Sequence, residues 1–350
     1  MQTKRYTRRD CLRLAAAAVV GYRSHRPLSA LVAQPFRAAE TPADSPKPMR
    51  GAFIILSTPF SESGAVDWDD LVREVDFCER GGVHGLVWPQ GSSSVARLTK
   101  DERMRGMEVL ANAARGRKPA LVLGVQGRDA AEMLQYARHA EALAPDALIA
   151  MPPSGAKSLD DYRDYFRALA RVTARPVFFQ TTGGAPNLTP PVDLIVGLAR
   201  EFPHLGYVKE ESRPLVERMK AEMQQRPAMK AVFSASYAAN WLYEMRLGID
   251  GVMTGMAMYA DLMARMWDLH QRRDAAALRD AFSRFLLMRN LSDSLPGADL
   301  YVMKKRGVFK TMVARTEAGP KKLTFSEDEI AEIEYRFEAL KPFLSIHAIS

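Results

Sequence analysis

The feature that most restricts the fold of this chain is an eightfold alternation of short β-branched runs with longer amphipathic stretches, beginning at Gly51. Such alternation is typical of parallel β/α units. A doubly wound open sheet would show the same alternation, but eight units of about 30 residues match the number that closes a barrel. We therefore predict an α/β fold of the TIM (β/α)8 barrel class. The expected strands are 53–58, 85–89, 120–125, 147–151, 176–181, 206–209, 231–234 and 251–254.

Capping residues predict where the intervening helices begin. Asp67 precedes an amphipathic stretch that should cover one face of the sheet, and Thr99 and Glu102 have the spacing of a capping box. Asp129 and Ser158 are expected to open two further helices. Each of these side chains can accept a hydrogen bond from a free amide of the first helical turn.

The chain after the barrel is predicted to be a helical extension packed on it. Residues 276–288 and 302–315 have helical patterns, and 326–329 form a capping box before a last helix. No strand is expected in this part of the chain. The predicted organisation is a leader and linker at 1–48, a barrel at 49–272 and a helical extension at 273–350.

The net charge of +8 is concentrated at the start of the chain. The first 50 residues contain ten Lys and Arg side chains against three Asp and Glu, so the remaining 300 residues are nearly neutral. A nearly neutral body lacks the basic face that binds a polyanion. No nucleic-acid partner is therefore expected.

The leader contains a paired arginine, Arg8 and Arg9, before a short apolar stretch at 15–21. This pattern resembles a twin-arginine export signal and predicts a periplasmic or exported protein. The apolar stretch is too short to span a bilayer, so no membrane anchor is expected. Basic residues at 23–26 and the lack of a clean Ala-x-Ala cleavage site leave a cytoplasmic protein with a basic tail as the alternative.

Residue types that bind metals or cofactors are scattered along the chain. Cys11 and Cys78 lie far apart, so neither a disulfide nor a cysteine-based metal site is predicted. The histidines lack metal-ligand spacing, and neither a dinucleotide motif nor a phosphate loop is present. No metal or organic cofactor is expected.

Barrel enzymes carry their chemistry where strands end and loops begin. The first predicted strand ends at Thr58, the second runs into a glycine followed by three serines, and the sixth ends at Lys209. An amine in an apolar barrel mouth should have a lowered pKa and be nucleophilic. Hydroxyls and backbone amides can hold a carboxylate. The alternatives are a polar turn at 91–94 and a lysine that faces solvent or pairs with Glu210 or Glu211.

Several segments of the chain match one pattern in a single register. They are 51–60, the Gly-Ser-Ser-Ser turn with 98–102, 206–209 and 248–253. Over about residues 50–345, they resemble the dihydrodipicolinate synthase and N-acetylneuraminate lyase family. The resemblance implies a β/α barrel whose Lys209 forms an imine with pyruvate or another 2-oxo acid, before a carbon–carbon bond is made or broken. It also implies a homo-oligomer, either a dimer or a tetramer.

The resemblance gives roles to individual residues. Lys209 would be the imine-forming lysine, and the serines at 92 and 93 would replace the two threonines of a Gly-Thr-Thr-Gly-Glu motif that holds the substrate carboxylate. The second Gly and the Glu of that motif are Ser94 and Val95 here. The predicted substrate-binding residues are Thr58, Ser92, Ser93, Gln180 and Met253.

The tyrosine relay of the family is missing from this chain. Where the family's fifth strand ends in a Tyr-Asn pair, this chain has Gln180, which cannot act as an acid or base near neutral pH. The tyrosine-bearing segment after the fourth strand is Pro152-Pro153-Ser154. Tyr237 is the nearest candidate hydroxyl. Acid–base assistance is typically worth about a hundredfold to ten-thousandfold in rate, so imine formation is the better-supported half of the mechanism.

Three functional hypotheses follow. The first is a divergent Schiff-base lyase of the class I aldolase type that acts on a 2-oxo acid through Lys209. The second is a non-catalytic barrel that binds a 2-oxo acid or a sugar acid. The third is a true 4-hydroxy-tetrahydrodipicolinate synthase, which the missing tyrosines and the export leader disfavour.

Overall fold

The computed structural model of the chain describes residues 46–346. Within this range, eight parallel strands close into a barrel in which β1 pairs with both β2 and β8. The strands are β1 (Gly51–Ile55), β2 (Gly85–Trp88), β3 (Ala120–Gly124), β4 (Ala147–Ala150), β5 (Val177–Gln180), β6 (Tyr207–Lys209), β7 (Ala231–Ser234) and β8 (Gly251–Thr254). The predicted TIM barrel is confirmed, with β1 beginning slightly earlier than expected. The predicted leader falls almost entirely outside the described residues.

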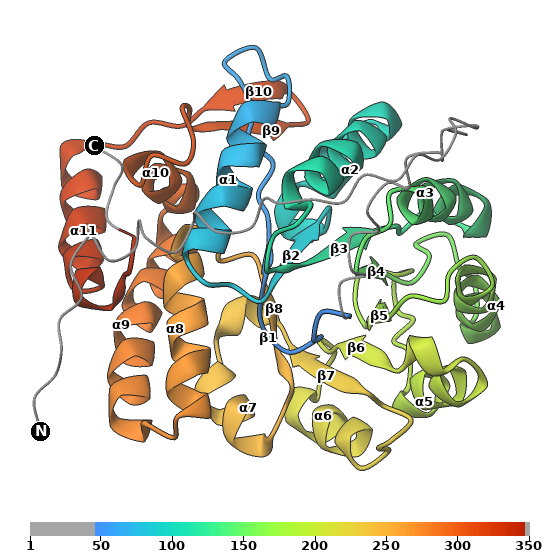
Figure 1. Ribbon diagram of the computed structural model, residues 1–350. Helices are drawn as coiled ribbons and strands as arrows, with labels where there is room; N and C mark the ends of the chain where they lie inside the picture. The colour runs from blue at the N-terminus through green and yellow to red at the C-terminus, as the bar shows by residue number, and fades with distance from the viewer. Residues whose placement is uncertain (1–45, 347–350) are drawn as a thin grey trace, which may run out of the picture. The chain divides into compact units, whose positions relative to one another are not determined.

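In the described part of the chain, one helix follows each barrel strand, and together these helices surround the barrel (Figure 1). They are α1 (Trp68–Arg80), α2 (Lys100–Ala114), α3 (Ala130–Ala142), α4 (Leu159–Ala170), α5 (Val192–Glu201), α6 (Leu215–Met223), α7 (Trp241–Leu247) and α8 (Ala260–Gln271). Asp67, Thr99, Asp129 and Ser158 each accept a hydrogen bond from a first-turn amide. The four predicted helix starts are therefore confirmed.

The inside of the barrel is filled by apolar side chains from alternating strand positions. Phe53, Phe178 and Phe233 are completely buried there. The ring of Phe233 lies 5.0 Å from that of Phe53 and 5.1 Å from that of Phe178, and both pairs are nearly perpendicular. Edge-to-face contacts of this kind favour close packing of aromatic rings. A second, larger apolar layer lies between the strands and the helices.

The C-terminal extension consists of helices and a short hairpin. The helices are α9 (Ala275–Ser294), α10 (Ala298–Lys305) and α11 (Glu327–Glu338), and the antiparallel strands are β9 (Val313–Thr316) and β10 (Gly319–Lys322). The capping box at Ser326 is confirmed. The predictions of a helix through 302–315 and of no strand beyond the barrel are wrong. Gly307 adopts a positive φ of 71° soon after α10 ends, which turns the chain out of the helix.

The hairpin lies against the loop that joins β1 to α1 (Figure 1). Val313 packs on Phe60 and Val66 from that loop. Arg315 donates two hydrogen bonds of 2.8 Å to the carboxylate of Glu102 and one of 3.0 Å to the carbonyl of Gly64. Contacts distant in sequence thus hold two short strands that local propensity would not favour.

Candidate active site

Lys209 ends β6 and is almost completely buried, with 3% of its surface exposed. In the parallel register, it lies between Gln180 on β5 and Phe233 on β7. Its side chain lines a cavity of about 380 Å³. The lining residues are Ile55, Gly91, Ser92, Val95, Ala96, Met151, Gln180, Gly183, Lys209, Glu211, Ser236, Tyr237, Met253, Thr254 and Gly255. They come mostly from the carboxyl ends of the strands and the loops that follow, where barrels of this class bind their ligands.

The ammonium group of Lys209 pairs with a carboxylate in the same cavity. Lys209 Nζ lies 2.9 Å from Oε2 of Glu211. Burial lowers the pKa of Lys209 below its usual 10.5, and the negative charge of Glu211 opposes part of that shift. Two environments that the sequence analysis treated as alternatives are therefore both present: Lys209 is desolvated in the barrel mouth, and it is paired with Glu211.

Glu211 is a site residue that the sequence reasoning considered only as an ion-pair partner. Its Oε2 also accepts a hydrogen bond of 2.6 Å from the hydroxyl of Thr182. Burial alone would raise its pKa, but Lys209, the Thr182 hydroxyl and the backbone amide of Ser236 together hold the pKa of Glu211 below 4.5. The alternation of side chains along a strand could have identified it, since a residue two positions after Lys209 returns to the same side of the chain.

Glu210, the residue between them, has a different environment. It is completely buried on the opposite side of the chain. Its carboxylate accepts a hydrogen bond of 2.6 Å from Thr181 and one of 3.0 Å from Arg218. The amide of Ser212 also donates to it at 2.6 Å. Glu210 therefore fixes the loop after β6 and has no carboxylate oxygen free for chemistry.

The serine-rich turn after β2 contributes one hydroxyl to the cavity. Ser92 lines it, whereas the Ser93 side chain is fully buried and donates a hydrogen bond of 2.6 Å to the carbonyl of Leu56. The Thr58 hydroxyl donates to the carbonyl of Ser93 at 2.6 Å and accepts from Trp88 at 3.0 Å. Neither Ser93 nor Thr58 lines the cavity, and their hydroxyls hold the turn through backbone carbonyls, so their predicted contact with the substrate stays a prediction. Ser94 keeps the left-handed conformation, with φ of 56°, that glycine adopts more easily.

Two buried polar atoms in the cavity lining have no hydrogen-bond partner among the described residues, Oε1 of Gln180 and Oγ1 of Thr254. The amide nitrogen of Gln180 donates to Thr182 at 3.3 Å, which leaves its oxygen as a free acceptor. Buried polar atoms without partners are costly, so these two can accept hydrogen bonds from water or from a ligand in the cavity. Met253, also predicted as a contact, forms part of the apolar wall.

Tyr237 lines the mouth of the cavity and is 49% exposed. It lies in a strained turn, because Ser236, Tyr237 and Ala238 have φ values of 51°, 52° and 58°. Each left-handed residue that is not glycine costs about 1–2 kcal/mol. Strain of this kind is concentrated at functional sites, and this turn contributes Ser236 and Tyr237 to the cavity lining.

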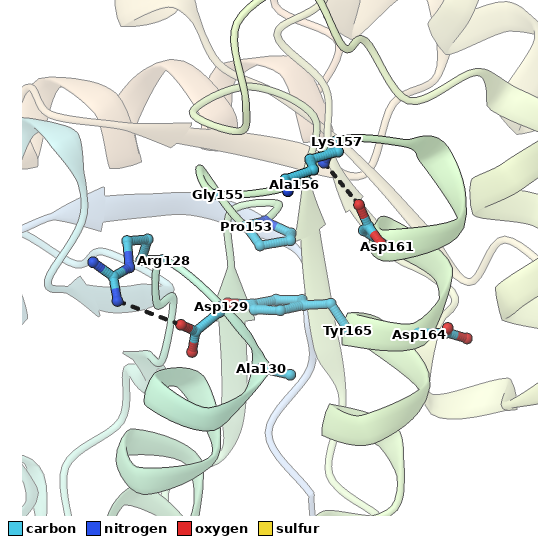
Figure 2. A pocket seen from close by; sticks show the side chains of 10 residues that line it. All are labelled: Arg128, Asp129, Ala130, Pro153, Gly155, Ala156, Lys157, Asp161, Asp164 and Tyr165. Carbon is cyan, nitrogen blue, oxygen red and sulfur yellow. Dashed lines mark hydrogen bonds and ion pairs between the residues drawn. The ribbon is translucent and has the colours of Figure 1, made fainter.

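A second cavity, of about 460 Å³, lies on the rim between the starts of α3 and α4 (Figure 2). Its charged side chains are engaged locally. Arg128 lies 3.7 Å from Asp129, and the Lys157 amide donates to Asp161 at 2.7 Å. Asp129 also caps α3, and Asp161 accepts a hydrogen bond from the Ser158 amide in the capping box of α4. None of the predicted site residues lines this cavity.

Other chemistry-bearing residues do not gather in the described part of the chain. In residues 46–346, no group of three or more His, Cys, Asp or Glu side chains is arranged to hold a metal ion. Cys78 is a free, buried thiol, and Cys11 lies outside this range. Among the same residues, no helix has both the length and the apolar character to cross a membrane.

A closed barrel with a buried lysine at the end of its sixth strand places the chain in the (β/α)8 class, whose active sites lie at the carboxyl ends of the strands. The model of the dihydrodipicolinate synthetase family matches residues 48–323. The chain belongs to this family.

The relatives differ considerably in sequence. A 4-hydroxy-tetrahydrodipicolinate synthase from Phenylobacterium zucineum is 30% identical over 168 residues, a match that spans 48% of this chain and only 56% of the relative. The dihydrodipicolinate synthase structure from Rhodopseudomonas palustris superposes with a TM-score of 0.72 at 20% identity, over 85% of this chain and 99% of the other. The structure of YagE, an Escherichia coli prophage protein of the same family in complex with pyruvate, superposes with a TM-score of 0.73 at 17% identity. This match covers 84% of this chain and 99% of the other. These structural matches show the shared fold.

Proposed function

We propose that this chain is a Schiff-base-forming lyase that acts on pyruvate or another 2-oxo acid, with Lys209 as the nucleophile. One observation carries the proposal: a lysine with a lowered pKa lies buried in a cavity at the end of the sixth barrel strand. Desolvation favours the neutral amine, which is the form that attacks a carbonyl carbon. The pyruvate complex of a barrel of the same family supports a 2-oxo acid as the substrate class.

The remaining lining residues suit the other groups of such a substrate. Ser92 offers a hydroxyl donor to the carboxylate, beside the backbone of the turn at 91–94. The free oxygen of Gln180 can accept a hydrogen bond from a hydroxyl group of the substrate. Met253 and Ile55 form part of the apolar wall of the same cavity.

Reductive trapping tests the proposal. The full chain is incubated separately with pyruvate and with each of a panel of other 2-oxo acids, and is then reduced with borohydride. Its mass is measured by mass spectrometry. We expect a covalent adduct that is lost in Lys209→Ala and retained in Lys220→Ala, which removes an exposed lysine of α6. Circular dichroism checks that both variants fold. Absence of an adduct with every 2-oxo acid would contradict the proposal.

A non-catalytic binding barrel is the second candidate, and the ion pair between Lys209 and Glu211 favours it. An ammonium held by a carboxylate at 2.9 Å can attract a substrate carboxylate without forming a bond to it. Calorimetry together with reductive trapping distinguishes the two functions. Binding of a 2-oxo acid or sugar acid to the wild type, with no adduct after borohydride reduction, would support the binding protein.

True 4-hydroxy-tetrahydrodipicolinate synthase activity is the least supported function. Gln180 occupies the position of the family's strand-five tyrosine, and Ser154 follows the two prolines after β4. We expect no condensation of pyruvate with aspartate semialdehyde in a coupled assay. Turnover in that assay would establish the synthase in place of the lyase.

A further inference from the structure

We infer that Glu211 is the acid–base group that carries protons between Lys209 and the substrate oxygen while the imine forms. This inference rests on the proposed function, because it concerns the covalent step at Lys209. The geometry points to Glu211 because its Oε2 lies 2.9 Å from the lysine nitrogen and both side chains line the same cavity. A general acid or base must be within such hydrogen-bonding reach of the proton that it moves.

The carboxylate is held in place from two neighbouring strands. The Thr182 hydroxyl, just after β5, donates to its Oε2 at 2.6 Å, and Lys209 at the end of β6 pairs with the same oxygen. Thr182 in turn accepts a hydrogen bond from Gln180 at 3.3 Å. A hydrogen-bonded chain therefore links Gln180, through Thr182, to a carboxylate beside the amine.

No other group in the lining is as well placed. The titratable side chains among the lining residues are Lys209, Glu211 and Tyr237. Tyr237 is half-exposed at the mouth of the cavity. Glu210 faces the other way and is neutralised by Arg218. The side chain of Glu211 retains 21% exposure, so a substrate entering the cavity can reach it.

The proton balance closes without any further reactant. One proton passes from the ammonium of Lys209 to Glu211, which leaves a neutral amine and a carboxylic acid. The nitrogen lone pair forms the C–N bond to the keto carbon, and the carbonyl π electrons move to oxygen. Glu211 protonates that oxygen and takes a proton from the nitrogen, which gives a neutral carbinolamine. It then donates its proton to the hydroxyl, which leaves as water, and an iminium and a carboxylate remain.

The substitution Glu211→Gln distinguishes a proton-transfer role from a purely structural ion pair, because the two roles predict opposite changes in the trapping rate. The charge of Glu211 raises the pKa of Lys209, so Glu211→Gln lowers that pKa further and increases the fraction of neutral amine. If Glu211 only held the ammonium, the variant would trap a 2-oxo acid faster near neutral pH. If Glu211 moves protons, the variant is slower by about a hundredfold to ten-thousandfold.

The test is the rate of cyanoborohydride trapping of pyruvate from about pH 3 to about pH 10, a range that extends below the usual pKa of a glutamate and includes neutral pH. We expect the wild-type trapping rate to be constant around neutral pH, because the one proton shared by Lys209 and Glu211 suffices for imine formation. The trapping rate of Glu211→Gln should be low and should increase as the pH rises. Glu211→Asp should recover part of the rate. Glu217→Gln, which removes an exposed carboxylate on α6, should match the wild type.

A second variant leaves the carboxylate in place. Thr182→Val removes the hydrogen bond that lowers the pKa of Glu211, so the acidic limb of the profile should move to higher pH. The role of Glu211 would be overturned if Glu211→Gln trapped pyruvate at or above the wild-type rate, or if the acidic limb of the pH profile did not move in Thr182→Val. Either result would leave the proposed function standing. A wild type that forms no adduct would overturn the proposed function, and this inference with it.

Discussion

Gln180 and Lys209 are register partners on adjacent parallel strands, β5 and β6. In a parallel pair, register partners point to the same side, so the amide and the amine both face the barrel mouth. The Gln180 oxygen has no partner among the described residues, whereas the lysine is paired with Glu211. These two strand ends thus present a free acceptor, the Gln180 oxygen, and a coupled proton pair to a ligand.

This arrangement predicts the titration of the lysine. Burial lowers the pKa of Lys209, so the amine should lose its proton below pH 10.5. Removal of the opposing charge in Glu211→Gln should shift the inflection lower still. An NMR titration of the lysine Cε, assigned by comparison with Lys209→Ala, measures both values. An inflection at or above 10.5 in the wild type would contradict the buried environment.

A second prediction concerns the contact between Gly255 and Ser92. A Cβ added at Gly255 would collide with the Ser92 hydroxyl, so Gly255→Ala should displace it from the cavity. We expect the half-saturating pyruvate concentration in trapping to rise about tenfold, equivalent to about 1.4 kcal/mol. Ser92→Ala should have a similar effect. The double variant should be no worse than Gly255→Ala alone, because that change already displaces the Ser92 hydroxyl and the Cβ of residue 92 is present in both chains.

The matched control for that substitution is Gly197→Ala. Gly197 lies in α5, and an added Cβ there would meet open space. This change should leave the pyruvate dependence unaltered and stabilise the helix by about 0.5–1 kcal/mol. If Gly255→Ala and Ser92→Ala instead raised the half-saturating pyruvate concentration additively, the two substitutions would act through different contacts.

Glu222 on α6 predicts how stability depends on pH. Burial, together with the nearby charge of Glu210, raises the pKa of Glu222 well above 4.5, and neither carboxylate oxygen has a hydrogen-bond partner among the described residues. With a raised folded-state pKa, its contribution to stability is fully present below pH 4.5 and is lost as the pH rises towards the folded value. Glu222→Gln should therefore stabilise the chain at pH 8, by about 1–3 kcal/mol.

Urea unfolding of both chains at two pH values measures this effect. The gain in Glu222→Gln should be smaller at pH 5, because the unfolded-state pKa of about 4.5 makes protonation of the carboxyl in the folded state much less costly there than at pH 8. An equal gain at both pH values would show that ionisation is not its cause.

The hairpin should depend on Arg315. Its guanidinium makes a bidentate, largely buried pair with Glu102 and also donates to two carbonyls, those of Gly64 and Arg97. Arg315→Ala should destabilise the chain by about 1–3 kcal/mol. Lys322→Ala, which breaks an exposed pair with Glu62, should cost less than about 0.5 kcal/mol. Thermal unfolding measures the loss of stability in each variant. Equal losses would contradict the view that the buried ion pair contributes more than the exposed one.

The barrel could be predicted from the sequence because its signals are local. Buried strands appear as apolar runs, and Asp67 or Thr99 marks a helix start by its own hydrogen bond. The hairpin gave no such signal, because β10 is Gly-Pro-Lys-Lys and only Val313 of β9 is buried. Its strands depend on Glu102 and Phe60, which are more than two hundred positions away.

The site was predictable in outline and not in its detail. Lys209 and Ser92 lie in one cavity, as strand-end reasoning suggested. The motif could not reveal that Ser93 turns inward to the Leu56 carbonyl, because neighbouring serines look alike in sequence. The importance of Glu211 depends on Thr182, a residue from a different strand end, and that proximity exists only in the closed barrel.

The most direct test of the central claim is peptide mapping of the borohydride-reduced chain after incubation with pyruvate. We predict that the reduced adduct is found on the peptide that contains Lys209, with the other lysines unmodified. Unmodified Lys209 at saturating pyruvate, with calorimetry showing that pyruvate is bound, would contradict covalent chemistry at this residue.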